Sequence, residues 1–361
     1  MNLADTLMSR PAWASTRRAG DDIVIATIGR LVRNLRSYPF PGWSTAKDRA
    51  ETAAVLLPVV KALPECRGAW HAELSELSYE SRRALLANKL LTPCMAARGE
   101  GCHLILPKNR RSMFLLNEEE HLVVHSFRCG SACAAVAEDL LALGERLSAQ
   151  LSVAHDPAFG YLTSLPGEAG DGLQLYQVLH LPALTMAGMM TQVTRAAEKL
   201  HINISPYYAD GQDDTGNTYV FFSIPGPQGS AGELTDYFDS VMKRLCEREL
   251  QVRRKLQDNS ADRLQDCIGR AYGLLRYARR LSLKELRDTC SVLRLATVLG
   301  HLEWESGADA AVAELRELCR RLSVETALAT EAEEDAQPQQ RADAVRRFLS
   351  ATPHHFTPIY A

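Results

Sequence analysis

Hydrophobic positions in the first two-thirds of the chain follow helical spacing in some segments and strand-like runs in others. Ala, Leu and Val recur every three to four residues over 44–64 and 134–151, which predicts amphipathic helices. Three apolar runs, 102–106, 112–116 and 122–127, are separated by only a few residues. Strands this close in sequence pair as antiparallel neighbours, because a parallel pair needs a long crossover. The pattern therefore predicts an α+β domain with a mainly antiparallel sheet flanked by helices.

The spacing becomes wholly helical after the Pro- and Gly-rich segment 225–229. Before it, one amphipathic helix is predicted over 181–200, starting at Pro182, with strands at 201–208 and 218–224. After it, we expect helices without a strand pair, interrupted by an acidic linker at 331–340. The predicted parts are an N-terminal extension (1–21), an α+β domain (22–254) and an all-helical C-terminal domain (255–361).

Composition and charge narrow the possible partners. A net charge of −3 gives no electrostatic reason to expect nucleic acid or an anionic membrane as a partner. No apolar run reaches the roughly 18 residues that span a bilayer, and the N-terminus lacks the apolar core of a secretion signal. The nine cysteines are odd in number and include no CxxC pair, which is typical of reduced thiols. We expect a cytoplasmic protein without a bound metal.

Five segments, in register along nearly the whole chain, resemble those of one enzyme family. They are DIVIATIGRLVRNL at 22–35, NEEEH at 117–121, GYLTS at 160–164, HLPAL at 180–184 and RAYGLL at 270–275. The corresponding family patterns are DIVLSSRIRLARNL, NEEDH, GYLTS, HLPAL and RSYGVL. The chain thus resembles the ATP:guanido phosphotransferases, and among them the bacterial protein-arginine kinases.

The resemblance implies a fold, a reaction and a set of site residues. It implies that ATP with Mg²⁺ lies on the antiparallel sheet and that the γ-phosphoryl group passes to a guanidino nitrogen, with carboxylates orienting the guanidinium. Glu118 keeps the place of the catalytic carboxylate, and Asp210 replaces a glutamate. It also implies a homodimer. The nucleotide-binding positions that it assigns are Thr27, Arg30, Gly170 and Gly172.

The chain departs from the family pattern where the phosphates should bind. Four family arginines fall on Ile28, Val123, Gln174 and Ser205, and only Arg30 keeps its type. A hydrogen bond to a charged group contributes roughly 1.5–3 kcal/mol. Losing four removes on the order of 5 kcal/mol, or at least about a thousandfold in affinity. Carboxylates at 168 and 171 add further negative charge.

These departures predict a protein-arginine-kinase-like pseudokinase that acts by binding or regulation. Its expected partners are free arginine or protein arginine side chains, and an active protein-arginine kinase or a Clp-type protease system. One alternative is a divergent active kinase that grips the ATP phosphates with residues such as Arg30 and Lys108. A structural dimer without a ligand is the third possibility.

Overall fold

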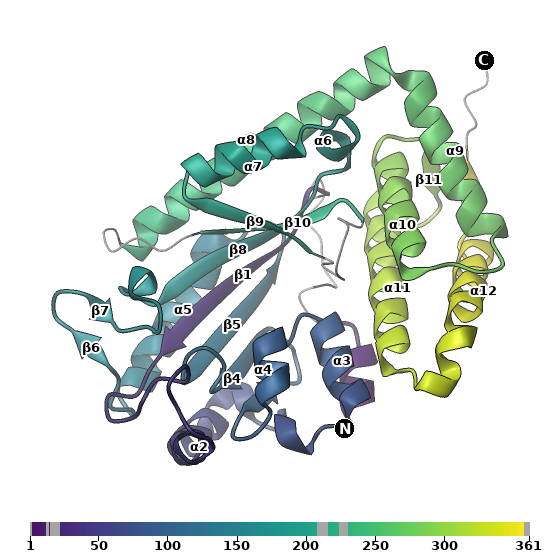
Figure 1. The fold of residues 1–361 in the computed structure, drawn as a ribbon. Coiled ribbons are helices and arrows are strands. Elements are labelled where there is room, and N and C mark those ends of the chain that lie inside the picture. The colour runs from purple at the N-terminus through teal and green to yellow at the C-terminus, as the bar shows by residue number, and fades with distance from the viewer. Residues whose placement is uncertain (1, 12–13, 15–21, 208–215, 224–229, 357–361) are drawn as a thin grey trace. The chain divides into compact units, whose positions relative to one another are not determined.

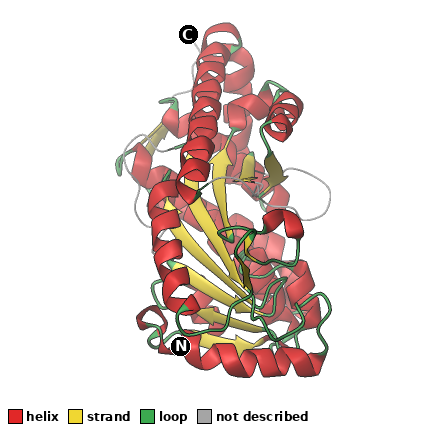
Figure 2. Ribbon diagram, turned by 90° about the vertical axis from the view of Figure 1, so that its left-hand side faces the viewer, coloured by secondary structure: helices red, strands yellow, loops and turns green. Residues whose placement is uncertain are grey.

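A computed structural model of the chain describes residues 2–11, 14, 22–207, 216–223 and 230–356 (Figures 1 and 2). The α-helices are α1 (Leu3–Met8), α2 (Ala46–Ala62), α3 (Tyr79–Ala87), α4 (Pro93–Arg98), α5 (Cys133–Ser148), α6 (Pro182–Met186), α7 (Met190–Lys199), α8 (Ala231–Asn259), α9 (Ala261–Tyr277), α10 (Leu283–Val298), α11 (Ala308–Leu328) and α12 (Gln337–Ala351). The strands are β1 (Val24–Arg33), β2 (Trp70–Glu73), β3 (His103–Leu106), β4 (Ser112–Leu116), β5 (Leu122–Cys129), β6 (His155–Asp156), β7 (Gly160–Tyr161), β8 (Leu173–His180), β9 (Ile202–Pro206), β10 (Thr218–Ser223), β11 (Leu302–Trp304) and β12 (His354–Phe356). Short 3-10 helices are η2 (Pro64–Cys66), η3 (Leu74–Glu76), η4 (Pro166–Glu168) and η5 (Glu331–Ala336).

Eight strands form one sheet in the order β2-β3-β4-β5-β1-β8-β10-β9. The pairs β2/β3, β3/β4, β4/β5 and β5/β1 are antiparallel. In the last pair Arg30 lies opposite His125, and His125 lies opposite Met113 on β4. This sheet, whose strands fan out in Figure 2, confirms the predicted antiparallel α+β architecture.

The chain forms two compact units, each made of separate segments. The first consists mainly of Ala26–Gln177 and Phe222–Ser240, and the second mainly of Val178–Phe221 and Val241–Ala361. The domain boundary between residues 254 and 255 falls within α8 and stays a prediction.

In the first unit, helix α5 packs closely against β1 at Gly29, which has no side chain. A Cβ on Gly29 would lie 2.4 Å from both Leu140 Cδ1 and Val136 Cγ1 of α5. Side chains alternate between the two faces of a strand. Gly29 and Thr27 therefore face α5, and Arg30 belongs to the opposite face of the sheet.

The C-terminal part of the second unit, from Val241 onward, is mainly helical, as predicted, with one addition. Helices α9 to α12 enclose a common core, and α10 begins with a capping box formed by Ser282 and Glu285. The all-helical prediction is wrong for β11 and β12, which pair as a short antiparallel ribbon. In β11 the buried Leu302 and Trp304 flank an exposed Glu303, a two-residue alternation that is too short to stand out in the sequence.

Two predicted segments differ in detail from the structure. The single helix expected over 181–200 is two helices, α6 and α7, which are separated at Gly188 with a φ of +67°. The left-handed backbone at this position ends the first helix. The acidic linker at 331–340 is helical, because Thr330 and Glu333 form a capping box that starts η5. Within the described part of the chain, no helix has the length and apolarity needed to cross a membrane.

Candidate functional site

The acidic residues at the end of β4 lie on a tight turn that leads into β5. Asn117 opens this turn with a φ of +58°, and its backbone N–H donates to the carbonyl of His121 at 2.9 Å. The Asn117 side-chain amide donates to the carbonyls of Arg49 and Gly101 at 2.9 and 2.8 Å. Asparagine tolerates the left-handed conformation, so the turn is fixed by its first residue.

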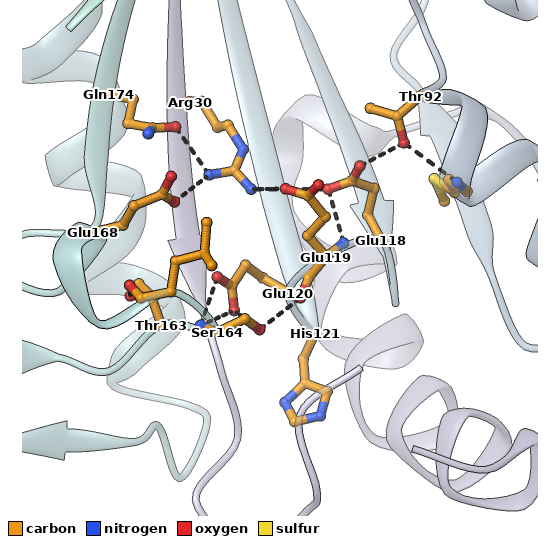
Figure 3. Close-up of polar contacts among 12 residues, drawn as sticks. Arg30, Thr92, Glu118, Glu119, Glu120, His121, Thr163, Ser164, Glu168 and Gln174 are labelled. Carbon is orange, nitrogen blue, oxygen red and sulfur yellow. Dashed lines mark hydrogen bonds and ion pairs between the residues drawn. The ribbon is translucent and has the colours of Figure 1, made fainter. Parts of the chain in front are cut away.

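His121 closes the turn and orders the neighbouring loop. Its Nδ1 accepts the backbone N–H of Leu35 at 3.0 Å, so its Nε2 carries the proton and donates to the carbonyl of Pro39 at 2.9 Å. Burial lowers the pKa of the His121 imidazole, which keeps it neutral. His121 is therefore a structural residue of the turn, and it lies away from the carboxylates in Figure 3.

Glu118 is buried and oriented by three hydrogen bonds. Its Oε1 accepts from Thr92 Oγ1 at 2.7 Å, and its Oε2 accepts from the backbone N–H of Glu119 at 2.9 Å. The carbonyl of Glu118 accepts from Arg98 Nη1 at 2.7 Å. Only 3% of the Glu118 surface is exposed. Helix α4 thus fixes Glu118 at two points: Thr92 at its N-cap holds the carboxylate (Figure 3), and Arg98 in its last turn holds the backbone carbonyl.

Glu120 serves a different purpose from Glu118. Its carboxylate accepts from Asn34 Nδ2 and from both the backbone N–H and the hydroxyl of Ser164. Burial raises the pKa of Glu120 even though these hydrogen bonds favour its charged form. Glu120 therefore ties the 160–164 segment to the turn, and its oxygens are fully engaged within the protein.

Arg30 lies among the remaining carboxylates. Its Nη2 is 3.8 Å from Glu118 Oε2 and 3.6 Å from Glu119 Oε2, and its Nη1 is 3.5 Å from Glu168 Oε2. Nη1 also donates to Gln174 Oε1 at 3.0 Å. Burial alone would lower the pKa of Arg30, but Tyr176 and the carboxylates outweigh it and raise the pKa. The site is thus an acidic cluster around one permanently charged guanidinium.

Gln174 links this cluster to β8. Its Oε1 accepts both from Arg30 Nη1 and from Tyr176 Oη, the latter at 2.9 Å. Burial raises the pKa of Tyr176 to about 12, so its hydroxyl keeps the proton that it donates. The ring of Tyr176 stacks on Phe222 with centroids 5.4 Å apart. Two donors therefore fix Gln174 with its carbonyl oxygen towards Arg30.

Other predicted site residues do not join this cluster. Thr27 is fully buried on the α5 face, where its hydroxyl donates to the carbonyl of Gly130 at 2.6 Å. Gly170 exchanges backbone hydrogen bonds with Tyr161, and Gly172 packs where a Cβ would lie 2.9 Å from Val32 O. Both glycines have positive φ values, so their backbone conformation explains the residue type. Asp210 lies outside the described residues.

The residues found where the family has arginine are all uncharged. Val123 is fully buried on β5, where it pairs with Val32, and Ile28 is half-buried on the Arg30 face of β1. Ser205 lies on β9, in the second unit. The added carboxylates are used within the protein: Glu168 faces Arg30, and Asp171 accepts from the first backbone N–H of α8 at 3.1 Å.

Three residues of the cluster were not predicted from the sequence. Thr92 precedes a proline, a signal for a helix start that could have identified it as an N-cap residue but not its contact with Glu118. Ser164 ends the GYLTS segment, which gives no sign that it binds Glu120. Tyr176 lies two residues after Gln174 on β8, so the alternation of a strand puts both side chains on one face.

In the described cluster, the arginine that the resemblance assigns to phosphate is engaged with other groups of the protein. The one arginine that the resemblance assigns to phosphate faces three carboxylates, and Gln174 offers it an acceptor. Lys108 lies in the turn between β3 and β4, at the opposite end of β4 from Glu118. The chemical group that the site does present is the buried and oriented carboxylate of Glu118.

Comparisons with known proteins agree with the fold and the sequence motifs. The family model for the C-terminal catalytic domain of ATP:guanido phosphotransferases matches residues 62–226, and that for the C-terminal domain of protein-arginine kinase McsB matches residues 261–358. A protein-arginine kinase of Desulforamulus reducens is 30% identical over 306 residues, which cover 83% of this chain and 85% of that protein. One of Exiguobacterium sp. is 28% identical over 303 residues, covering 83% and 86%.

Solved structures share the fold at lower identity. Lombricine kinase superposes with a TM-score of 0.54 at 19% identity, covering 67% of this chain and 71% of its own. A duplicated taurocyamine kinase from Schistosoma mansoni, with bound transition state analog components, gives a TM-score of 0.54 at 18% identity. This alignment covers 66% of the present chain and only 34% of the duplicated one. The chain therefore belongs to the ATP:guanido phosphotransferase family, within its protein-arginine kinase branch.

Proposed function

We propose that this protein is a pseudokinase that binds the guanidinium group of arginine, free or in a protein, at the Glu118 cluster and does not transfer phosphate from ATP. The observation that carries the proposal is the position of Arg30. Its guanidinium faces Glu118, Glu119 and Glu168 at 3.5–3.8 Å. An arginine committed to carboxylates neutralises them and is not available to phosphate.

The charge of the cluster supports a cationic ligand. Glu118, Glu119 and Glu168 face Arg30, and Arg98 binds the backbone carbonyl of Glu118, so three carboxylates face two arginines and the described cluster keeps an excess of negative charge. A planar guanidinium suits bidentate pairing with carboxylates. Glu119 is the accessible member, with 58% of its side chain exposed. Solvated ion pairs contribute at most about 1 kcal/mol each, so three of them give at most about 3 kcal/mol, and we expect a dissociation constant of several millimolar. Asp210 is proposed as a further carboxylate of this site.

The first test separates binding from catalysis. Calorimetric titration of free arginine into the purified protein is expected to give heats that weaken with salt, and titration of Mg-ATP is expected to give none. The Glu118→Gln variant keeps an oxygen for Thr92 but loses the charge, so its arginine heats should fall at least severalfold. Incubation with radiolabelled ATP should give no phosphoarginine above background. Labelled phosphoarginine that disappears in Glu118→Gln would instead establish an active kinase.

The proposed setting of this binding activity is a cytoplasmic regulatory assembly. The match of residues 261–358 to the McsB C-terminal domain supports a protein partner, which we propose to be an active protein-arginine kinase or a Clp-type protease system. A homodimer is part of the proposal. Light scattering after size-exclusion chromatography checks it, because a dimer has twice the mass of the 39.9 kDa chain.

A further inference from the structure

The side chain at the centre of the acidic cluster carries the same chemical group as the proposed ligand. We propose that Arg30 is the specificity-determining residue of the site, because its guanidinium fills the position that a guest guanidinium would take. A guest then enters only when Arg30 moves out of the cluster. This inference rests on the proposed function. It adds that the Arg30 guanidinium competes with the ligand for the same carboxylates.

The contacts of Arg30 show how firmly the competitor is held. Its Nη2 lies 3.6–3.8 Å from the carboxylates of Glu119 and Glu118, beyond hydrogen-bonding distance, and is buried without a hydrogen-bond acceptor. Glu118 is meanwhile fixed by Thr92 and by the turn. A guest that pairs with these oxygens at about 2.8 Å would make the charge-assisted bonds that Arg30 leaves unmade. Arg30 therefore occupies the site without forming hydrogen bonds to the carboxylates of Glu118 and Glu119.

Gln174 holds Arg30 in place. The bond from Arg30 Nη1 to Gln174 Oε1, at 3.0 Å, is its one direct hydrogen bond to a side chain among the described residues. Tyr176 orients that amide through its own hydroxyl. The family pattern has an arginine at 174, and two adjacent guanidiniums would repel each other unless an anion lay between them. With glutamine at 174, Arg30 instead gains an acceptor that draws it into the carboxylates.

The test compares ligand binding in matched variants of the full-length protein. Arg30→Met removes the internal guanidinium and keeps an unbranched side chain, and Gln174→Leu removes the hydrogen bond without changing the charge of the cluster. Arg36→Ala is the control, because it deletes an exposed arginine that contacts the His155 carbonyl outside the cluster. Each protein is titrated calorimetrically with guanidinium chloride and with free arginine in the low millimolar range, and with methylammonium chloride as a non-planar cation.

Arg30→Met is expected to bind guanidinium and arginine at least about tenfold more tightly than the wild type, the equivalent of one hydrogen bond to a charged group. Gln174→Leu should show a smaller gain in affinity, and Arg36→Ala should show none. Methylammonium should bind Arg30→Met no more tightly than it binds the wild type. Circular dichroism confirms that the variants are folded. If Arg30→Met does not fold alone, recovery of its circular dichroism with millimolar guanidinium, but not methylammonium, supports the proposal, and equal recovery with both overturns it.

The outcomes distinguish this inference from the proposed function. Arginine binding by the wild type with no gain in Arg30→Met overturns the competitor role and leaves the proposed function intact. Tight binding by Arg30→Met with none by the wild type supports the competitor role but shows that the native protein does not bind arginine. Absence of binding to both proteins overturns both.

Discussion

At the scale of single residues, Arg30 shows how a retained side chain changes its role when its neighbours change. The resemblance assigned it to phosphate from sequence type alone. In the structure its partners are Glu118, Glu119, Glu168 and Gln174, and the last two lie in η4 and β8, more than 130 residues later in the chain. A side chain's ionic partner depends on which distant residues the sheet brings beside it, so this contact could not be predicted from the 22–35 segment.

The residue-scale predictions that succeeded depend on local rules. Glu118 was placed at the end of a strand, and the structure shows it on the turn after β4. Thr27 was grouped with Arg30, yet residues three apart in a strand point to opposite faces. Thr27 and Arg30 therefore lie on different faces of β1, and the nucleotide-binding role of Thr27 stays a prediction. Asp210 stays a prediction.

A histidine on the sheet, His125, predicts how the stability of the protein depends on pH. Burial, with a smaller effect of the Arg30 charge, lowers the pKa of His125 from 6.5 to about 3. The folded protein thus resists a proton that the unfolded chain accepts, and stability is lost as pH falls from about 6.5 towards 3. His71, whose pKa is lowered to about 4 by burial, acts in the same direction. Urea unfolding of wild type and His125→Gln between pH 4 and 8 should show a shallower pH dependence in the variant. Parallel curves would contradict the assignment.

At the scale of elements, sequence spacing predicted helices and strands well where one face is buried. The runs at 102–106, 112–116 and 122–127 correspond to β3, β4 and β5, because each has apolar side chains packed on the sheet. Sequence spacing failed where the backbone conformation of one residue decides whether a helix continues. Gly188, with a φ of +67°, divides the predicted helix at 181–200 into two. A glycine is permissive rather than directive, so its conformation cannot be read from its identity.

Packing of α5 on the sheet depends on Gly29. A Cβ at this position would lie 2.4 Å from atoms of Val136 and Leu140, so Gly29→Ala forces the helix or these side chains to move. We expect a loss of about 1–3 kcal/mol in the free energy of unfolding, as for other overpacked cores. Gly269→Ala, where a Cβ meets nothing within 4 Å inside α9, is the matched control and should be neutral or slightly stabilising. Denaturant unfolding curves measure both, and equal midpoints would contradict the packing argument.

At the scale of the whole molecule, the order of the parts was predictable but the ends of the units were not. An α+β region followed by helices follows directly from the change in spacing after residue 229. Each compact unit, however, combines segments from distant parts of the chain, and α8 continues through residue 254, where a boundary was expected. Polarity marks where a helix is exposed; it does not mark where a helix ends.

A buried charge network in the second unit connects three of these distant segments. Glu249 of α8 is fully buried and accepts the backbone N–H groups of Ala183 and Leu184, both at 3.0 Å. Arg253, one turn further along α8, donates to Glu249 at 2.8 Å and also to Asp22. Each charge is thus compensated inside the protein, where an unpaired charge is costly.

Arg253→Met is therefore expected to destabilise the protein by about 3–5 kcal/mol, because it leaves Glu249 buried without a cation. Arg248→Ala, on the exposed side of the same helix, should change stability by less than about 0.5 kcal/mol. Adding Glu249→Gln to Arg253→Met removes the uncompensated charge and should recover part of the loss. Denaturant unfolding measures the three variants, and amide hydrogen exchange at Ala183 and Leu184 reports whether α6 loosens locally. A double variant that is no more stable than Arg253→Met would show that the lost stability comes from packing of the arginine stem and not from the buried carboxylate.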